Sequence, residues 1–151
     1  MENARGVSVP RWFRIVSVLA LIWMLFGILS FVMDPLTSEA TLAEMSETHR
    51  QLFEARPLWL FVVYGVSVFS GLAGAVGLVM RKVWAVHAFA VSLVFIVIQF
   101  VYVLFVMDAV GLLGAAEALP FPMVIFTIGA LLLWLSVRAR QQGWIGTAPS
   151  A

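Results

Sequence analysis

Among the polar side chains inside the long apolar stretches of this sequence, five are candidates for binding a ligand or a proton. They are Tyr64, His87, Ser92, Gln99 and Tyr102. Burying a primary amide such as that of Gln99 without a hydrogen-bond partner costs about 2–7 kcal/mol of free energy. We therefore expect Gln99 either to bond a neighbouring helix or to read the hydroxyl groups of a ligand in a cavity.

Ser92, Gln99 and Tyr102 are separated by seven and three residues, a spacing that places all three on one face of a helix. Together with Tyr64 and Trp23 they define a candidate site for a small neutral molecule. His87 lies nearer the start of the same stretch. Because histidine titrates near neutral pH, His87 either relays protons or remains a neutral, hydrogen-bonded side chain.

The sequence contains no motif typical of an enzyme. It lacks G-x-S-x-G, H-E-x-x-H, a glycine-rich phosphate loop and any pair of carboxylates within an apolar stretch. With no cysteine, thiol nucleophiles, Fe–S clusters and Cys-type zinc sites are excluded. Met45 and His49 are four residues apart, but two ligands are too few for a metal site. We expect no enzymatic activity, cofactor or metal.

The elements that position these residues follow from composition. The chain is 63% hydrophobic and only 11% charged, against about 25% charged in a soluble domain. Four stretches lack Asp, Glu, Lys and Arg, and each approaches the roughly 20 residues needed to cross a bilayer. The first stretch exceeds the apolar region of about 7–15 residues in a signal peptide, so we expect it to be retained.

The predicted fold is all-α: an antiparallel bundle of four transmembrane helices in a single domain, residues 1–151. We expect the helices at 12–33, 58–80, 83–107 and 120–138. Two external loops, 34–57 and 108–119, and a cytoplasmic tail, 139–151, complete the chain.

The basic residues are concentrated on one side of this topology. Seven of the nine fall in the N-terminal segment, the turn between the second and third helices, and the tail: Arg5, Arg11, Arg14, Arg81, Lys82, Arg138 and Arg140. Because Lys and Arg stay preferentially cytoplasmic, we expect both termini in the cytoplasm and the protein in a bacterial inner membrane. The basic residues require no nucleic acid to explain them.

The first external loop contains a predicted amphipathic helix at about 38–55. Thr41 and Glu44 have the spacing of a capping box, and the apolar residues after them recur on one face. This helix either lies on the membrane surface or binds a protein partner.

Small residues recur along two of the predicted helices. Ser67, Ser70, Gly71 and Gly74 give small-x-x-x-small pairs in the second helix, and Gly27 belongs to a similar face of the first. Such faces let two helix backbones approach closely in lipid. Their neighbour is either another helix of this chain or another protein, including a second copy.

The tetrapeptide Phe-Val-Met-Asp occurs at 31–34 and 105–108, where the first and third predicted helices end. An internal duplication and independent convergence at a membrane boundary both account for this pair. We interpret the tetrapeptide as a boundary marker.

A family resemblance is carried by several segments and two single residues: 21–27, 57–59, 81–85, 89–93, Gln99 and Tyr102. With these features the chain resembles a group of small four-helix bacterial membrane proteins often labelled "sugar transporter". In that family an Asn commonly follows the Trp of the first helix, whereas Met24 follows Trp23 here. The resemblance implies a site for a sugar-like solute that lacks this one polar group.

Two functions are expected from these observations. The leading hypothesis is a non-enzymatic accessory or scaffolding subunit, associating with a protein partner or with itself through the small-residue faces and the external loop helix. The alternative is a facilitative carrier of a small neutral solute. Four helices leave little room for alternating access, so the carrier is expected to act as an oligomer.

Overall fold

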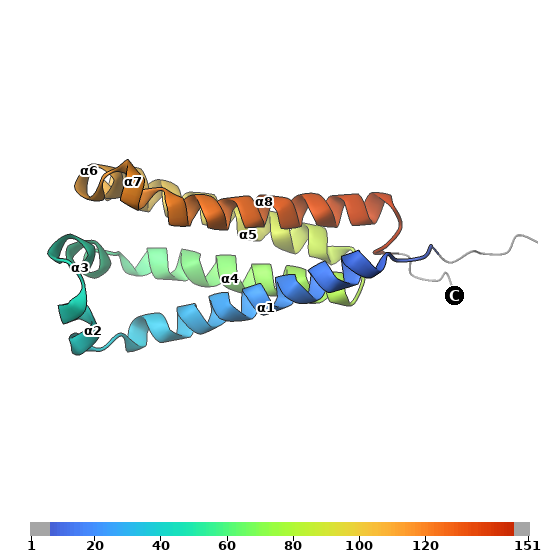
Figure 1. Cartoon of the computed structure of the whole chain (residues 1–151), viewed down its shortest axis with the longest axis horizontal. Helices are drawn as coiled ribbons and strands as arrows, with labels where there is room; N and C mark the ends of the chain where they lie inside the picture. The colour runs from blue at the N-terminus through green and yellow to red at the C-terminus, as the bar shows by residue number, and fades with distance from the viewer. Residues whose placement is uncertain (1–6, 147–151) are drawn as a thin grey trace, which may run out of the picture.

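The computed structural model describes residues 7–146 and contains only helices and connecting turns there (Figure 1). Four helices are long and apolar enough to cross a membrane. They are α1 (Arg11–Met33), α4 (Leu58–Val79), α5 (Trp84–Val101) and α8 (Pro120–Gln141). The predicted all-α fold with four transmembrane helices is confirmed, and these helices make the chain a multi-pass membrane protein.

The four long helices form two layers, with α1 beside α4 and α5 beside α8 (Figure 1). The main contacts between them follow chain order: α1 with α4, α4 with α5, and α5 with α8. The short helices gather at one end of the bundle, here called the loop end. The opposite end holds residues 7–10, the turn 80–83 and residues 142–146, and is called the terminal end (Figure 1).

The most deeply buried side chains lie toward the terminal end. Phe13 of α1, Leu78 of α4, Phe89 of α5 and Ile145 after α8 are each at most 2% exposed. The ring of Trp144 packs against that of Phe13, with 5.4 Å between the centroids. The segment after α8 therefore returns to α1 and closes the bundle at this end.

The small residues predicted to form packing faces are covered by helices of the same chain. A Cβ atom at Gly74 would lie 2.8 Å from the Phe89 ring, and one at Gly71 would lie 2.8 Å from Met24 Sδ and 3.0 Å from Ser92 Oγ. Ser67 is also buried. Close approach of α1 and α5 to α4 thus depends on the absence of side chains along α4.

Two other small residues have looser roles. A Cβ atom at Gly27 would meet Val68 Cγ1 at 3.6 Å, an ordinary contact distance. The Ser70 hydroxyl donates to backbone oxygens of its own helix. Neither residue is required for the closest helix contacts.

The expected single helix at about 38–55 is wrong. The loop contains a 3₁₀ turn, η1 (Asp34–Leu36), and two short helices, α2 (Glu39–Glu44) and α3 (Glu47–Glu54). The Ser38 hydroxyl accepts from Thr41 N, and the Ser46 hydroxyl accepts from His49 N. Two serine N-caps therefore start two helices, and Thr41 is not the cap. Met45 between them has an extended backbone, with ψ at 150°.

The second loop and the adjoining helices also depart from the expected boundaries. It folds into α6 (Ala109–Leu113) and α7 (Ala115–Ala118), and His49 Nε2 lies 3.2 Å from Glu117 Oε1 across the two loops. The third membrane helix is α-helical to Val101 and continues as a π-helical turn, η2 (Tyr102–Val106). α8 extends to Gln141, beyond its expected end at residue 138.

We predict that Gly74→Ala destabilises the fold whereas Gly27→Ala does not. The new methyl group at residue 74 overlaps the Phe89 ring, and overpacking costs about 1–3 kcal/mol. The gain in helix propensity, about 1 kcal/mol, is the same at both positions. Thermal unfolding in mild detergent measures the difference, and equal midpoints for the two variants would contradict the assigned role of Gly74.

Candidate functional site

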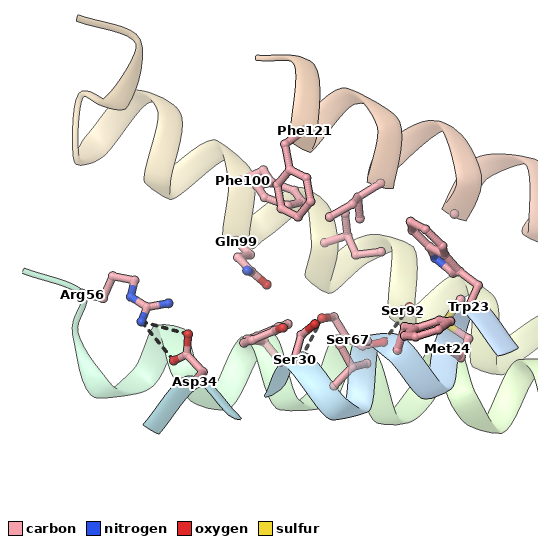
Figure 2. A pocket seen from close by; sticks show the side chains of 17 residues that line it. Trp23, Met24, Ser30, Asp34, Arg56, Ser67, Ser92, Gln99, Phe100 and Phe121 are labelled. Carbon is pink, nitrogen blue, oxygen red and sulfur yellow. Dashed lines mark hydrogen bonds and ion pairs between the residues drawn. The ribbon is translucent and has the colours of Figure 1, made fainter. Parts of the chain in front are cut away.

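A cavity of about 430 Å³ lies between the two helix layers. Trp23 and Met24 line it at one end, and Asp34 and Arg56 line it toward the loop end (Figure 2). All four long helices contribute to its walls. Trp23, Phe100 and Phe121 supply aromatic surface from α1, α5 and α8 respectively. The cavity is thus bounded mainly by apolar side chains, as in most small-molecule sites.

The Gln99 side chain extends from α5 into this cavity (Figure 2). It is partly buried, and within residues 7–146 its amide has no hydrogen-bond partner. A primary amide provides two donors and one acceptor oxygen. Gln99 therefore makes no bond to another helix in this part of the chain, and its amide faces the cavity.

Ser92, in contrast, forms a hydrogen bond between two helices. It is 3% exposed, and its hydroxyl donates to the Ser67 carbonyl oxygen at 2.7 Å. This bond joins α5 to α4 at the cavity wall, where an unpaired hydroxyl would be unfavourable. Ser92 therefore fixes the spacing of the two helices.

Tyr64 also lines the cavity, from α4. The Phe31 ring meets the Tyr64 ring edge-on at 5.3 Å between centroids and stacks on Phe61 at 4.5 Å. A Cβ atom at Gly65 would lie 3.1 Å from the Phe31 ring. Phe31 therefore packs on α4 at Gly65, where no side chain intervenes, and its ring contacts that of Tyr64.

Tyr102 and His87 do not belong to the cavity. The Tyr102 ring packs edge-on against Trp59, with 4.6 Å between centroids. Tyr102 follows Gln99 in ordinary α-helical geometry, and the π-helical turn that it begins alters the spacing only of the side chains after it. His87 is exposed on α5 near the terminal end. The cavity therefore brings together Tyr64, Ser92 and Gln99 but neither Tyr102 nor His87, and a shared role for all five candidate residues stays a prediction.

An ion pair at the loop end of the cavity was not anticipated from the sequence. Arg56 donates from one terminal nitrogen to both carboxylate oxygens of Asp34, at 3.1 and 3.0 Å (Figure 2). Arg56 Nε also donates to the Phe53 carbonyl oxygen at 3.2 Å, and the guanidinium lies 4.1 Å from the Phe53 ring centroid. The two side chains are only 30% and 20% exposed.

The chemical character of the cavity is neutral. Its single pair of opposite charges is mutually satisfied, and its other polar groups are the Gln99 amide, the Trp23 indole N–H and hydroxyls. Among residues 7–146, no three His, Cys, Asp or Glu side chains lie close enough to hold a metal ion. The arrangement suits hydrogen bonding and apolar contact, and it lacks an unpaired charge for an ionic ligand.

None of the family models, curated proteins or solved structures compared with the chain matches it.

We predict measurable coupling between Asp34 and Arg56. A double-mutant cycle with Asp34→Asn and Arg56→Gln should give about 1 kcal/mol of coupling in unfolding free energy, because the pair is mostly buried. The matched control is the Glu47–Arg50 pair of α3, which is 62% and 39% exposed. It should give roughly 0.3–0.5 kcal/mol, and a larger value for the control would contradict the assignment.

Proposed function

We propose that the chain is a ligand-binding membrane protein whose cavity holds a small molecule with neutral polar groups. The observation that carries this proposal is the Gln99 amide, which extends into the cavity with no protein partner in the described part of the chain. Hydroxyl groups of a ligand would bond both the NH₂ group and the carbonyl oxygen of the amide. The aromatic walls would contact the apolar faces of the same molecule.

The accessory or scaffolding role stays a prediction. The small residues that motivated it, Gly71, Gly74 and Ser67, are covered by α1 and α5 of the same chain. Association with another protein would therefore have to use another surface. The loop-end helices α2 and α3 remain available for this, since their residues are exposed or only partly buried.

We predict that Gln99→Leu weakens binding of the ligand while leaving the fold intact. Leucine has a similar size but cannot hydrogen-bond, and each neutral hydrogen bond contributes about 0.5–1.5 kcal/mol. Loss of the amide should reduce binding about tenfold. Small molecules that co-purify with the full chain in mild detergent are extracted and measured by mass spectrometry.

The matched control is Gln51→Leu. Gln51 is exposed on α3 and bonds only Glu47 Oε1, at 2.9 Å, so the same chemical change is made outside the cavity. The control should retain the molecule as wild type does. The proposal would be contradicted if wild type and both variants retained the molecule equally, or if no molecule co-purified with any of them.

A carrier role is the second candidate, and the shape of the bundle favours it. The cavity extends to the loop end, whereas Phe13, Trp144 and Ile145 fill the terminal end. A cavity that is filled at one end and extends to the other supports the proposal of a carrier open to one side. The family resemblance implies a sugar-like solute, whose hydroxyl groups would bond Gln99.

We expect glucose to enter proteoliposomes containing the chain faster than protein-free vesicles. Gln99→Leu should lower the uptake rate about tenfold, and Gln51→Leu should leave it unchanged. Radiolabelled glucose provides the measurement. Uptake no faster than in protein-free vesicles would reject the carrier role for glucose and leave the binding proposal to the co-purification test.

A further inference from the structure

A second cavity, of about 240 Å³, lies between α1 and α4 near the terminal end. Arg14 and Arg81 both line it, and Val9, Phe13, Val18 and Leu78 supply apolar walls. This cavity shares no residue with the larger one. It combines two guanidinium groups with a hydrophobic groove at the end of two membrane helices.

Both guanidinium groups lack a carboxylate partner within the described part of the chain. The segments at this end, residues 7–14, 80–84 and 138–146, contain no Asp or Glu. No carboxylate among residues 7–146 therefore neutralises the positive charge of this cavity. Arginine binds phosphate oxygens with two parallel N–H donors, which makes an anionic phosphate the natural counter-charge.

Arg81 is held in position by the backbone of the C-terminal segment. Its Nε donates to the Trp144 carbonyl oxygen at 2.8 Å, and its carbonyl oxygen accepts from Gly146 N at 2.9 Å. Its backbone is left-handed, with φ at 60°, which is uncommon for a residue other than glycine. Because Nε bonds the Trp144 carbonyl oxygen, the two terminal nitrogens of Arg81 remain to donate to a ligand such as a phosphate.

The depth of the cavity matches the boundary between phosphate and acyl chain. Arg14 lies in the first turn of α1, and Arg81 follows the end of α4 by two residues. Val18 is one turn further along α1, about 6 Å deeper at 1.5 Å per residue. A lipid with its phosphate at the arginines would therefore place its acyl chain against Val18 and Leu78.

We propose that Arg14 and Arg81 bind the phosphate of an anionic phospholipid whose acyl chain lies in the groove between α1 and α4. The lipid belongs to the leaflet at the terminal end, which the distribution of basic residues predicts to be cytoplasmic. Basic pockets between membrane helices on that side are suited to anionic headgroups. The site is independent of the ligand proposed for the larger cavity.

Native mass spectrometry of the full chain in mild detergent tests this site. The probes are palmitoyl-oleoyl phosphatidylglycerol and palmitoyl-oleoyl phosphatidylcholine, which have the same acyl chains. We expect wild type to bind the anionic lipid about thirtyfold more tightly, from two arginines near the headgroup. Equal affinity for the two lipids would overturn the proposal.

Two double variants separate a specific site from general attraction. Arg14→Gln with Arg81→Gln should reduce phosphatidylglycerol binding to the level of phosphatidylcholine. Arg138→Gln with Arg140→Gln removes the same charge at the same end but outside the cavity. Because distant exposed charges are screened, this control should change affinity less than about threefold. An equal loss in both double variants would overturn the site.

The groove is tested by filling it. Val18→Trp places a large ring in the cavity and should weaken phosphatidylglycerol binding about tenfold, whereas Leu19→Trp alters an exposed neighbour outside it. Unchanged unfolding midpoints without added lipid show that each variant is folded.

Inorganic phosphate should not displace the lipid. Full displacement would overturn the lipid site, because it would show that the arginines bind any small anion. Gln99→Leu should leave lipid binding unchanged, which distinguishes this site from the larger cavity.

Discussion

The close contact of α4 with α5 is the interaction on which the rest of the structure depends. Helices in lipid gain little from the hydrophobic effect between them, so they associate mainly through van der Waals contact and interhelical hydrogen bonds. Gly74 allows the Phe89 ring to reach the α4 backbone, and the Ser92–Ser67 bond joins the same two helices. Met24 of α1 reaches the same region at Gly71. Three helices therefore meet at one level of the bundle.

The larger cavity follows from that meeting point. α1 packs mainly on α4, and α8 packs mainly on α5. The space between α1 and α8 is therefore not filled by extensive direct contact of these two helices. At the terminal end, Trp144 and Ile145 fill it by packing with Phe13. Toward the loop end it stays open, and the Asp34–Arg56 pair lies at its border.

Local sequence patterns predicted some elements well and others poorly, for physical reasons. Apolar runs identified the four long helices because hydrocarbon requires every backbone group to be bonded within the segment. The loop helix was predicted as one element because apolar periodicity does not reveal a break. Two serines with equivalent capping positions, Ser38 and Ser46, produced two helices. The π-helical turn that follows Tyr102 likewise has no sequence signature, and the contact of the Tyr102 ring with Trp59, outside the cavity, joins residues distant in the chain.

The sequence by itself determined the membrane-spanning segments and the presence of a polar amide among apolar residues, because both depend on composition along a single helix. Which polar groups are satisfied was decided by tertiary structure alone. Ser92 donates to the Ser67 carbonyl oxygen, Gln99 lines a cavity, and Asp34 pairs with an arginine 22 residues away. These outcomes depend on which helix faces meet, and that arrangement is set by contacts between residues distant in the chain.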